Sequence, residues 1–150
     1  MPQTLSKVYV HLVFSTKNRT ETLPKAHLDE VFAYVASVVN ANHCRAIRVG
    51  GTSNHIHVLF LQGNTISLSD LVRTIKSCTS RWINSKTNLF PHFCWQSGFG
   101  AFSVSQSQAD RVIKYIEGQA EHHKKVSFQE EFLRICKLYD VAVDERYVWD

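Results

Sequence analysis

Hydrophobic and polar residues follow two different periods at the start of the chain. Residues 7–16 place every second apolar side chain on one face, which is typical of a half-buried strand. The side chains on this face are Val8, Val10, Leu12 and Phe14. Residues 24–43 instead carry apolar side chains at three- and four-residue spacing from Leu28 onward, which predicts an amphipathic helix. The chain therefore begins with a predicted strand followed by a helix.

The middle of the chain predicts a hairpin and a second helix. Residues 44–51 and 55–62 are predicted to form two strands, because both are rich in apolar and β-branched residues and a glycine- and asparagine-containing turn separates them. Residues 66–86 predict another amphipathic helix, since their apolar side chains fall on one face. The opposite, outer face of this helix is basic.

The last third predicts one more strand and two helices. After an irregular, aromatic-rich stretch at 89–100, residues 101–105 form a short strand, and Ser105 can cap the helix that follows. Ser127 and Glu130 have capping-box spacing at the start of the final helix. The order of elements, with its central hairpin, matches a split βαβ unit. We therefore predict an α+β, ferredoxin-like fold whose mainly antiparallel sheet has its helices packed on one face.

Composition adds limits to this picture. A chain of 150 residues without repeats or linkers predicts a single domain over 1–150. No stretch approaches the roughly 18 consecutive apolar residues of a membrane span, and the N-terminus lacks the pattern of a secretory signal. We therefore expect a cytoplasmic protein without a membrane partner. The formal net charge of +4 mildly favours an anionic partner such as nucleic acid.

Two histidines, His55 and His57, provide the first candidate chemistry. Side chains alternate across a strand, so both imidazoles point to the same face, with Cβ atoms roughly 6–7 Å apart, and can reach one metal ion. Ile56 and Val58 face the other side, where a helix layer can cover them. In the alternative interpretation, hydrogen bonds on an open sheet face satisfy the imidazoles. A third ligand is needed to decide between the two.

The helix after Ser105 carries a polar flank beside its apolar stripe. At about 100° per residue, Arg111, Tyr115, Gln119 and His122 lie within roughly 80° of one another. A metal held by two imidazoles and an amide oxygen could polarise a phosphodiester for attack by the tyrosine hydroxyl. The resulting phosphotyrosine would keep the energy needed to reseal a strand. Alternatively, the tyrosine simply lies half buried at the edge of the core.

Several basic side chains are candidates for contacts with DNA phosphates. Arg73, Lys76 and Arg81 share the outer face of the predicted helix at 66–86. Arg111 and His122 lie on the polar flank of the tyrosine helix. A solvated helix face is the alternative interpretation for each of them.

Three motifs carry a family resemblance. NHIHVLF, CWQSGFGAFSVS and YIEGQAEHH, in this order and spacing, resemble the single-tyrosine HUH transposases of the smallest bacterial insertion sequences and their relatives associated with repetitive extragenic palindromes (REP). The resemblance covers nearly the whole chain. It implies that Tyr115 is the nucleophile and that His55, His57 and Gln119 are the metal ligands.

The same resemblance implies a reaction and partners. Members of this family cleave and rejoin single-stranded DNA beside hairpins, through a 5′-phosphotyrosine intermediate and with Mg²⁺ or Mn²⁺. They are typically homodimers with composite active sites, although the REP-associated relatives can be monomeric. We therefore expect a metal-dependent single-strand DNA endonuclease and strand transferase.

The chain departs from the family pattern at two positions that are not catalytic. Phe99 and Gly118 stand where a tyrosine and an asparagine are expected, and a glycine inside a helix costs roughly 0.5–1 kcal/mol. Two other functions stay open. One is a regulator that binds hairpin DNA on the same fold without active transposition. The other is an unrelated metal hydrolase that uses the histidine pair with His122 or His123, an all-histidine set that suits zinc.

Overall fold

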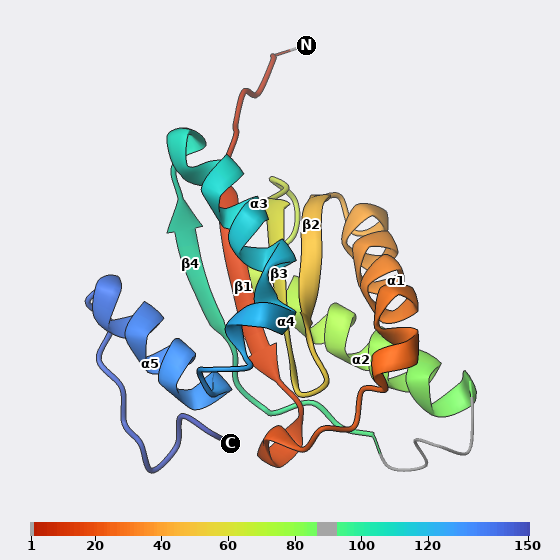
Figure 1. The fold of residues 1–150 in the computed structure, drawn as a ribbon. Helices are drawn as coiled ribbons and strands as arrows, with labels where there is room; N and C mark the ends of the chain where they lie inside the picture. The colour runs from red at the N-terminus through yellow and green to blue at the C-terminus, as the bar shows by residue number, and fades with distance from the viewer. Residues whose placement is uncertain (1, 87–92) are drawn as a thin grey trace.

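The computed structural model describes residues 2–86 and 93–150, which form a four-stranded sheet and its helices (Figure 1). The strands are β1 (Tyr9–Ser15), β2 (Arg45–Thr52), β3 (His55–Leu61) and β4 (Gly100–Val104). The helices are α1 (Leu28–Ala41), α2 (Leu68–Lys86), α3 (Ala109–Glu117), α4 (Gln119–His122) and α5 (Phe128–Leu138). No helix within these residues is long and apolar enough to cross a membrane. Residues 89–92 of the predicted aromatic-rich stretch lie outside the described residues.

The strands are ordered β2-β3-β1-β4, and each neighbouring pair is antiparallel. This order confirms the predicted α+β class with a ferredoxin-like antiparallel sheet. Both β1 and β3 are interior strands, with neighbours on each side. The histidine-bearing strand β3 is therefore hydrogen-bonded along both edges, which fixes its register.

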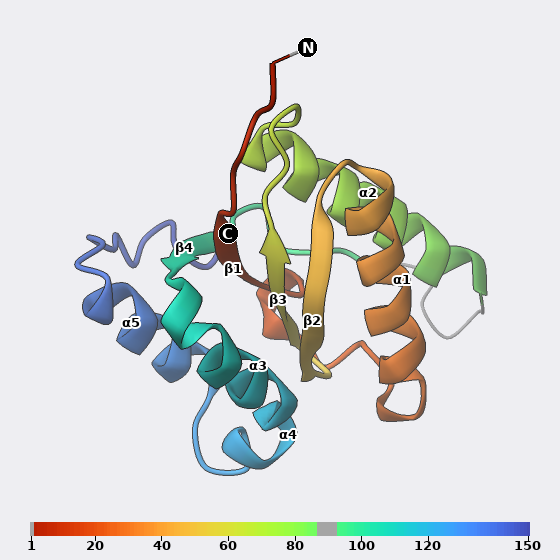
Figure 2. The same cartoon turned by 90° about the horizontal axis from the view of Figure 1, so that it is seen from above.

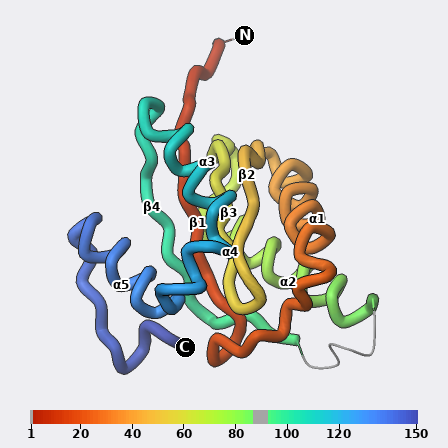
Figure 3. The backbone as a smooth tube through the Cα atoms, viewed as in Figure 1, coloured from red at the N-terminus to blue at the C-terminus, as the bar shows by residue number. Residues whose placement is uncertain are grey.

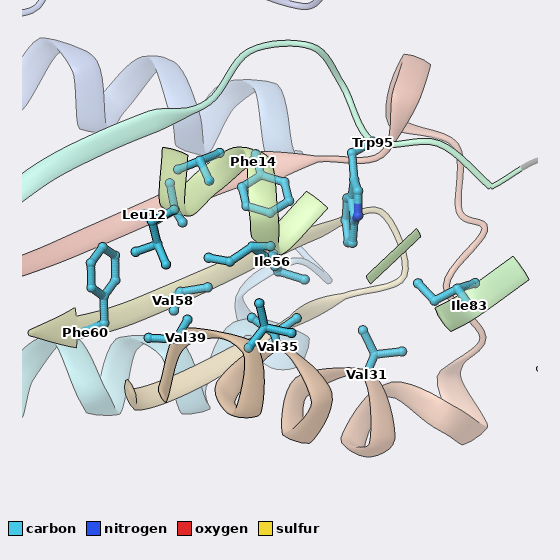
Figure 4. Packing of buried hydrophobic residues seen from close by; sticks show 14 of the residues in the cluster. Leu12, Phe14, Val31, Val35, Val39, Ile56, Val58, Phe60, Ile83 and Trp95 are labelled. Atoms are coloured by element: carbon cyan, nitrogen blue, oxygen red, sulfur yellow. The ribbon is translucent and has the colours of Figure 1, made fainter. Parts of the chain in front are cut away.

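One face of the sheet carries the main hydrophobic core (Figure 4). The β1 and β3 side chains that face it are Leu12, Phe14, Ile56, Val58 and Phe60, all fully buried. Helices α1 and α2 cover this face with the apolar stripes that their spacing predicts, led by Val35 and Val39 from α1 and by Leu71 and Ile75 from α2. The predicted separation of core residues from histidines across β3 is confirmed.

The other face of the sheet is covered as well. Figure 2 shows α1 and α2 on one side of the strands and α3, α4 and α5 on the other. Ile116 of α3 packs on Leu59, and Phe132 of α5 belongs to a cluster with Val13. The expectation that the helices share one face is therefore wrong in this detail. The physical reason is that β1 and β3 bury side chains on both of their faces, so each face needs a helix layer.

The predicted tyrosine helix is divided into shorter elements. A 3-10 turn (Gln106–Gln108) precedes α3, and Gly118 separates α3 from α4. The prediction that Ser105 caps this helix is wrong, because its side chain makes no capping hydrogen bond and instead lies 3.2 Å from the Ser107 hydroxyl. At the start of α5 the predicted cap is confirmed, since the Ser127 hydroxyl accepts a hydrogen bond from the Glu130 amide at 3.2 Å.

The segment after α5 turns back toward the lower end of β1 (Figure 3). There the Asp150 carbonyl accepts hydrogen bonds from the amides of Ser97 and Gly98 at 3.0 and 3.1 Å. The Arg19 guanidinium donates to the Trp149 carbonyl at 3.1 Å. Residues from two distant parts of the chain thus hold the C-terminal segment, and with it α5, against the sheet.

Candidate active site

Strand β3 brings His55 and His57 into a fully buried position on the face that α3, α4 and α5 cover. Their rings lie 5.1 Å apart between centroids. The alternation of side chains along the strand thus produces the predicted pair, but under a helix layer and not on an open sheet face.

Each histidine ring is held from behind at Nδ1. His55 Nδ1 lies 2.8 Å from Asn54 Oδ1 and 3.0 Å from Thr52 Oγ1, and His57 Nδ1 lies 2.8 Å from His11 Nε2. Both Nε2 atoms therefore point into the space between the sheet and the helices. A hydrogen-bond partner on the far nitrogen is the usual support for a metal-binding histidine.

Gln119 and Tyr115 reach the histidine pair from the helices above. Gln119, at the start of α4, is buried, and its Oε1 lies 2.8 Å from His55 Nε2. Tyr115 is half buried on α3, with its ring centroid 5.7 Å from that of His57. The structure thus brings together all four residues that the sequence nominates as nucleophile and metal ligands.

A carboxylate that the sequence analysis did not nominate lies at the centre of the cluster. Glu131, on α5, is 2% exposed. Its Oε1 lies 3.0 Å from His57 Nε2 and 3.1 Å from His123 Nε2. Its Oε2 accepts hydrogen bonds from the Tyr115 hydroxyl and, at 2.9 Å, from Gln119 Nε2. The single carboxylate therefore connects the histidines with the tyrosine.

The donor set fits a divalent metal ion. Potential ligand atoms of His55, His57, His123 and Glu131 all lie within 4.8 Å of one another. Among the described residues, the Nε2 atom of His123 is buried without a hydrogen-bond partner, although it lies 3.1 Å from Glu131 Oε1. A buried nitrogen without a hydrogen bond, aimed at a carboxylate, is the arrangement that a cation between them would complete. The same is true of His122 Nε2, which lies 3.4 Å from Glu131 Oε2.

Burial also keeps two histidines of the cluster, the candidate ligand His55 and His11 beside His57, uncharged. It lowers the pKa of His55 to about 3 and that of His11 to about 3, with the proximity of His57 adding to both shifts. Both imidazoles are therefore neutral near pH 7. A neutral imidazole offers the nitrogen lone pair that a metal requires.

Glu131 and Tyr115 are shifted in opposite directions. Burial alone would raise the pKa of Glu131, but its contacts with His123 and His57 outweigh burial and lower the pKa. Burial, followed by the hydrogen bond to Glu131, raises the pKa of Tyr115. Near neutral pH the pair is therefore an ionised carboxylate that accepts a hydrogen bond from a neutral phenol.

The predicted DNA-binding residues lie on two different faces. Arg73, Lys76 and Arg81 belong to α2, behind the sheet as seen from the tyrosine, whereas Arg111 and His122 lie on the tyrosine's side. Arg73 pairs with Asp70 at 2.9 Å. His122 has its ring centroid 5.6 Å from that of Tyr115.

Lys76 already has partners within the chain. Its ammonium donates hydrogen bonds to the carbonyls of Gln96, Ser97 and Gly98 at 2.8, 3.2 and 2.6 Å. This lysine therefore fastens the segment before β4 to α2. A role of any of these five residues in DNA binding stays a prediction.

Two buried residues of the cluster were missed by the sequence analysis, and each leaves a signal in the pattern. Glu131 lies on the apolar stripe of α5 with Phe128, Phe132 and Ile135, where a carboxylate is out of place. His11 lies on the same face of β1 as Val13, opposite the main core. A polar residue at a core position of a predicted element is thus the signal that could have found both.

Comparisons with known proteins bear on the fold and on the family. Two solved structures share the fold. One is the crystal structure of a candidate transposase from Deinococcus radiodurans R1, which is 20% identical with a TM-score of 0.62 and matches 79% of this chain and 95% of that one. The other is a REP-associated tyrosine transposase bound to a REP hairpin, which is 15% identical with a TM-score of 0.60 and matches 84% of this chain and 74% of that one.

The family is given by the sequence itself. No relative was found among curated proteins. Residues 4–119, however, match the family model described as "Transposase IS200 like". This range includes β1 to β4 and α1 to α3, and it ends at Gln119, the predicted amide ligand. Because the match covers most of the chain, the protein belongs to the IS200-like transposase family.

Proposed function

We propose that this protein cleaves and rejoins single-stranded DNA at hairpin-bearing ends through a 5′-phosphotyrosine at Tyr115. One observation carries the proposal. The Tyr115 hydroxyl shares a carboxylate with His57, so the candidate nucleophile and a candidate metal ligand meet in one cluster. A tyrosine that only lined the core would have no need of a buried carboxylate and several histidines beside its hydroxyl.

The metal ligands of this reaction are His55, His57 and Gln119, which would hold a divalent cation through two Nε2 atoms and one amide oxygen. When bound, the cation would polarise the phosphodiester and offset the charge that develops on its non-bridging oxygens. Either Mg²⁺ or Mn²⁺ suits the reaction. The imidazole nitrogens favour Mn²⁺, because Mg²⁺ prefers oxygen ligands.

The tyrosine performs the bond exchange. Tyr115 Oη attacks phosphorus, and the bond from phosphorus to the 3′ oxygen breaks as the new bond forms. A free 3′-hydroxyl leaves, and the 5′ end of the other fragment stays on Tyr115. Attack of a 3′-hydroxyl on this phosphotyrosine rebuilds a phosphodiester and frees Tyr115 without ATP. The intermediate therefore supports strand transfer as well as cleavage.

Hairpin DNA is the substrate that we propose, supported by the neighbour that was solved with a REP hairpin. A homodimer with composite sites and a cytoplasmic location stay predictions. Within one chain, Tyr115 already contacts Glu131, which contacts His57. A site contained in one chain gives the simplest arrangement for the cleavage step.

A covalent-trapping assay tests the proposal. Labelled single strands that contain the hairpins flanking the gene are incubated with protein and Mn²⁺, and the products are separated on denaturing gels. We expect a slowly migrating protein–DNA adduct that EDTA abolishes and that Tyr115→Phe eliminates. The matched control is Tyr147→Phe, since Tyr147 is 64% exposed and remote from the cluster in sequence.

The other outcomes separate the remaining functions. Hairpin binding on native gels without any adduct would favour the regulator. Cleavage that survives in Tyr115→Phe would favour a metal hydrolase. Either outcome would overturn the proposed strand transfer.

A further inference from the structure

We propose that Glu131 is a catalytic residue, with Oε1 as a metal ligand and Oε2 as the acceptor of the Tyr115 proton. This inference rests on the proposed function, which by itself needs only the tyrosine, the histidine pair and Gln119. It concerns a helix, α5, that follows the family-matched residues 4–119. Family membership therefore does not imply it.

The two oxygens of the carboxylate face different partners. Three imidazole nitrogens surround Oε1, those of His57, His123 and His55, at 3.0, 3.1 and 3.5 Å. The partners of Oε2 are the Tyr115 hydroxyl, Gln119 Nε2 and, at 3.4 Å, His122 Nε2. One oxygen thus lies among potential ligands and the other against the nucleophile. A carboxylate that bridges metal and nucleophile requires this division.

The position of Glu131 argues against a purely structural role. It lies on the stripe where α5 otherwise packs Phe128 and Phe132 on the sheet, and an apolar residue would fill that place without the cost of burying a charge. Its contacts come from β3, α3, α4 and the segment after α4. These contacts converge on the reacting group and not on the core.

The nucleophile also needs a proton acceptor. The Tyr115 hydroxyl must lose its proton when Oη bonds to phosphorus. Among the described residues, the group that accepts the Tyr115 hydrogen bond is Glu131. As a bond to phosphorus forms, the phenolic oxygen becomes far more acidic, and its proton can pass to the carboxylate already in place.

The step balances as follows. The Tyr115 O–H bond breaks and its proton goes to Glu131 Oε2, while the Oη–P bond forms and the bond from phosphorus to the 3′ oxygen breaks. The departing 3′ oxygen takes a proton from water. In the reverse direction, the protonated Glu131 returns its proton to Tyr115 Oη as a 3′-hydroxyl rebuilds the phosphodiester, and the 3′-hydroxyl loses its own proton to solvent. Glu131 therefore serves cleavage as a base and rejoining as an acid.

The test compares Glu131→Gln with Glu130→Gln, the same change at an exposed neighbour on α5. The first readout is the single-turnover rate of adduct formation with saturating DNA and Mn²⁺. We expect Glu131→Gln to slow it roughly 10²- to 10⁴-fold, the usual contribution of a general base. Glu130→Gln should keep the wild-type rate. Hairpin affinity in EDTA should be equal in both variants, because the proposed role concerns the metal and the proton.

The second readout is independent of cleavage. Co²⁺ is titrated into metal-free protein, and the visible absorption of the bound ion reports its ligands. Loss of a carboxylate ligand should change the spectrum and weaken Co²⁺ binding at least about tenfold in Glu131→Gln, and neither in Glu130→Gln. Glu131→Asp, which keeps the charge but shortens the side chain, is the control for misfolding of Glu131→Gln. It should show intermediate losses in both readouts.

The outcomes distinguish this inference from the proposed function. If Tyr115-dependent adducts form at the wild-type rate in Glu131→Gln or Glu131→Asp, with an unchanged Co²⁺ spectrum, Glu131 is structural and the inference fails alone. If the wild-type protein forms no adduct, the proposed function fails and the proton role fails with it. Altered Co²⁺ binding in Glu131→Gln would then still support the ligand role.

Discussion

Hydrogen bonds at the Nδ1 atoms decide what the two site histidines can do. For Nε2 to offer a lone pair, Nδ1 must carry the ring proton and donate it. Asn54 Oδ1 lies 2.8 Å from His55 Nδ1 and His11 Nε2 lies 2.8 Å from His57 Nδ1, so each is placed to accept that proton. His11 is only 5% exposed, and its contact with His57 accounts for a polar side chain at this buried position. A buried, neutral imidazole can accept this hydrogen bond, whereas an imidazolium could not.

Removing this acceptor should weaken metal binding. We expect His11→Leu to lower the affinity for Mn²⁺ by about 10- to 100-fold, because His57 loses the partner that fixes its ring and its proton. Isothermal titration of the metal-free protein measures the change. The same substitution at the exposed His27 is the control, and equal affinities in the two variants would show that His11 has no such role.

At this scale the sequence predicts the site in part. Tyr115, Gln119 and the histidine pair belong to short motifs, so spacing along one strand or one helix is enough to associate them. Glu131 is 74 residues from His57, and only the folded chain brings them together. Position on an apolar stripe can mark such a residue as unusual, but it cannot name its partners.

Among the elements, the close approach of α3 to β2 positions the nucleophile. Gly50 pairs with His57 across the β2–β3 ladder. A Cβ at Gly50 would lie 2.7 Å from Ile116 Cγ2 and 2.8 Å from the Ile116 carbonyl oxygen, closer than such atoms can pack. Ile116 follows Tyr115 directly. Because Gly50 has no Cβ, α3 can lie this close to β2, and the approach sets the distance between Tyr115 and the histidine pair.

Gly118 differs, although it also lies beside the tyrosine. Its φ of −88° is accessible to any residue, and an added Cβ would make ordinary contacts, 3.4 Å from the Lys114 carbonyl oxygen. The break between α3 and α4 therefore does not require a glycine. Alanine at this position removes freedom from the unfolded chain without introducing a clash.

These two glycines should respond in opposite ways to alanine. Gly50→Ala should reduce the free energy of unfolding by about 1–3 kcal/mol, because the overpacked contact must be relieved. It should also slow adduct formation as α3 is displaced. Gly118→Ala should raise the free energy of unfolding by about 0.4–1 kcal/mol and keep the rate. Urea unfolding and the trapping assay measure both, and a stable, fully active Gly50→Ala would refute the positioning argument.

Periodicity predicts most elements but not their arrangement. The strands, α1 and α2 lie close to their predicted ranges, and α5 begins where its predicted cap places it, because each has a clear apolar face. An apolar stripe shows that a helix is covered, yet it does not say by which face of a sheet. The face of β1 and β3 that carries His11, Val13, His57 and Leu59 mixes polar and apolar residues, so its burial under three helices could not be inferred from alternation alone.

For the whole molecule, the position of positive charge determines how DNA can lie. The tyrosine and Arg111 are on one side of the sheet, and the basic residues of α2 are on the other. A hairpin that reaches both must pass around an edge of the sheet. DNA confined to the tyrosine's side would leave α2 in solvent.

Salt dependence distinguishes these paths. If Arg73 and Arg81 contact phosphates, replacing both with Gln should reduce the slope of log affinity against log salt by about 1.4, roughly 0.7 for each phosphate on a single strand. Adduct formation at saturating DNA should be unchanged. Binding titrations at several salt concentrations measure the slope, with Arg146→Gln as control because Arg146 pairs with Asp144 at 2.7 Å. An unchanged slope in the double variant would confine the DNA to the other side.

The alternation along β3 has a consequence for how the chain avoids misfolding. A shift of its pairing by one residue would exchange the two faces, placing two imidazoles among Val35, Val39 and Phe14 and two branched aliphatic side chains against a carboxylate. Neither arrangement could satisfy its polar groups, so such an alignment would be strongly unfavourable. His55 and His57 thus also favour the native alignment of β3 over the shifted one. Replacing both with apolar residues would remove this energetic preference together with the active site.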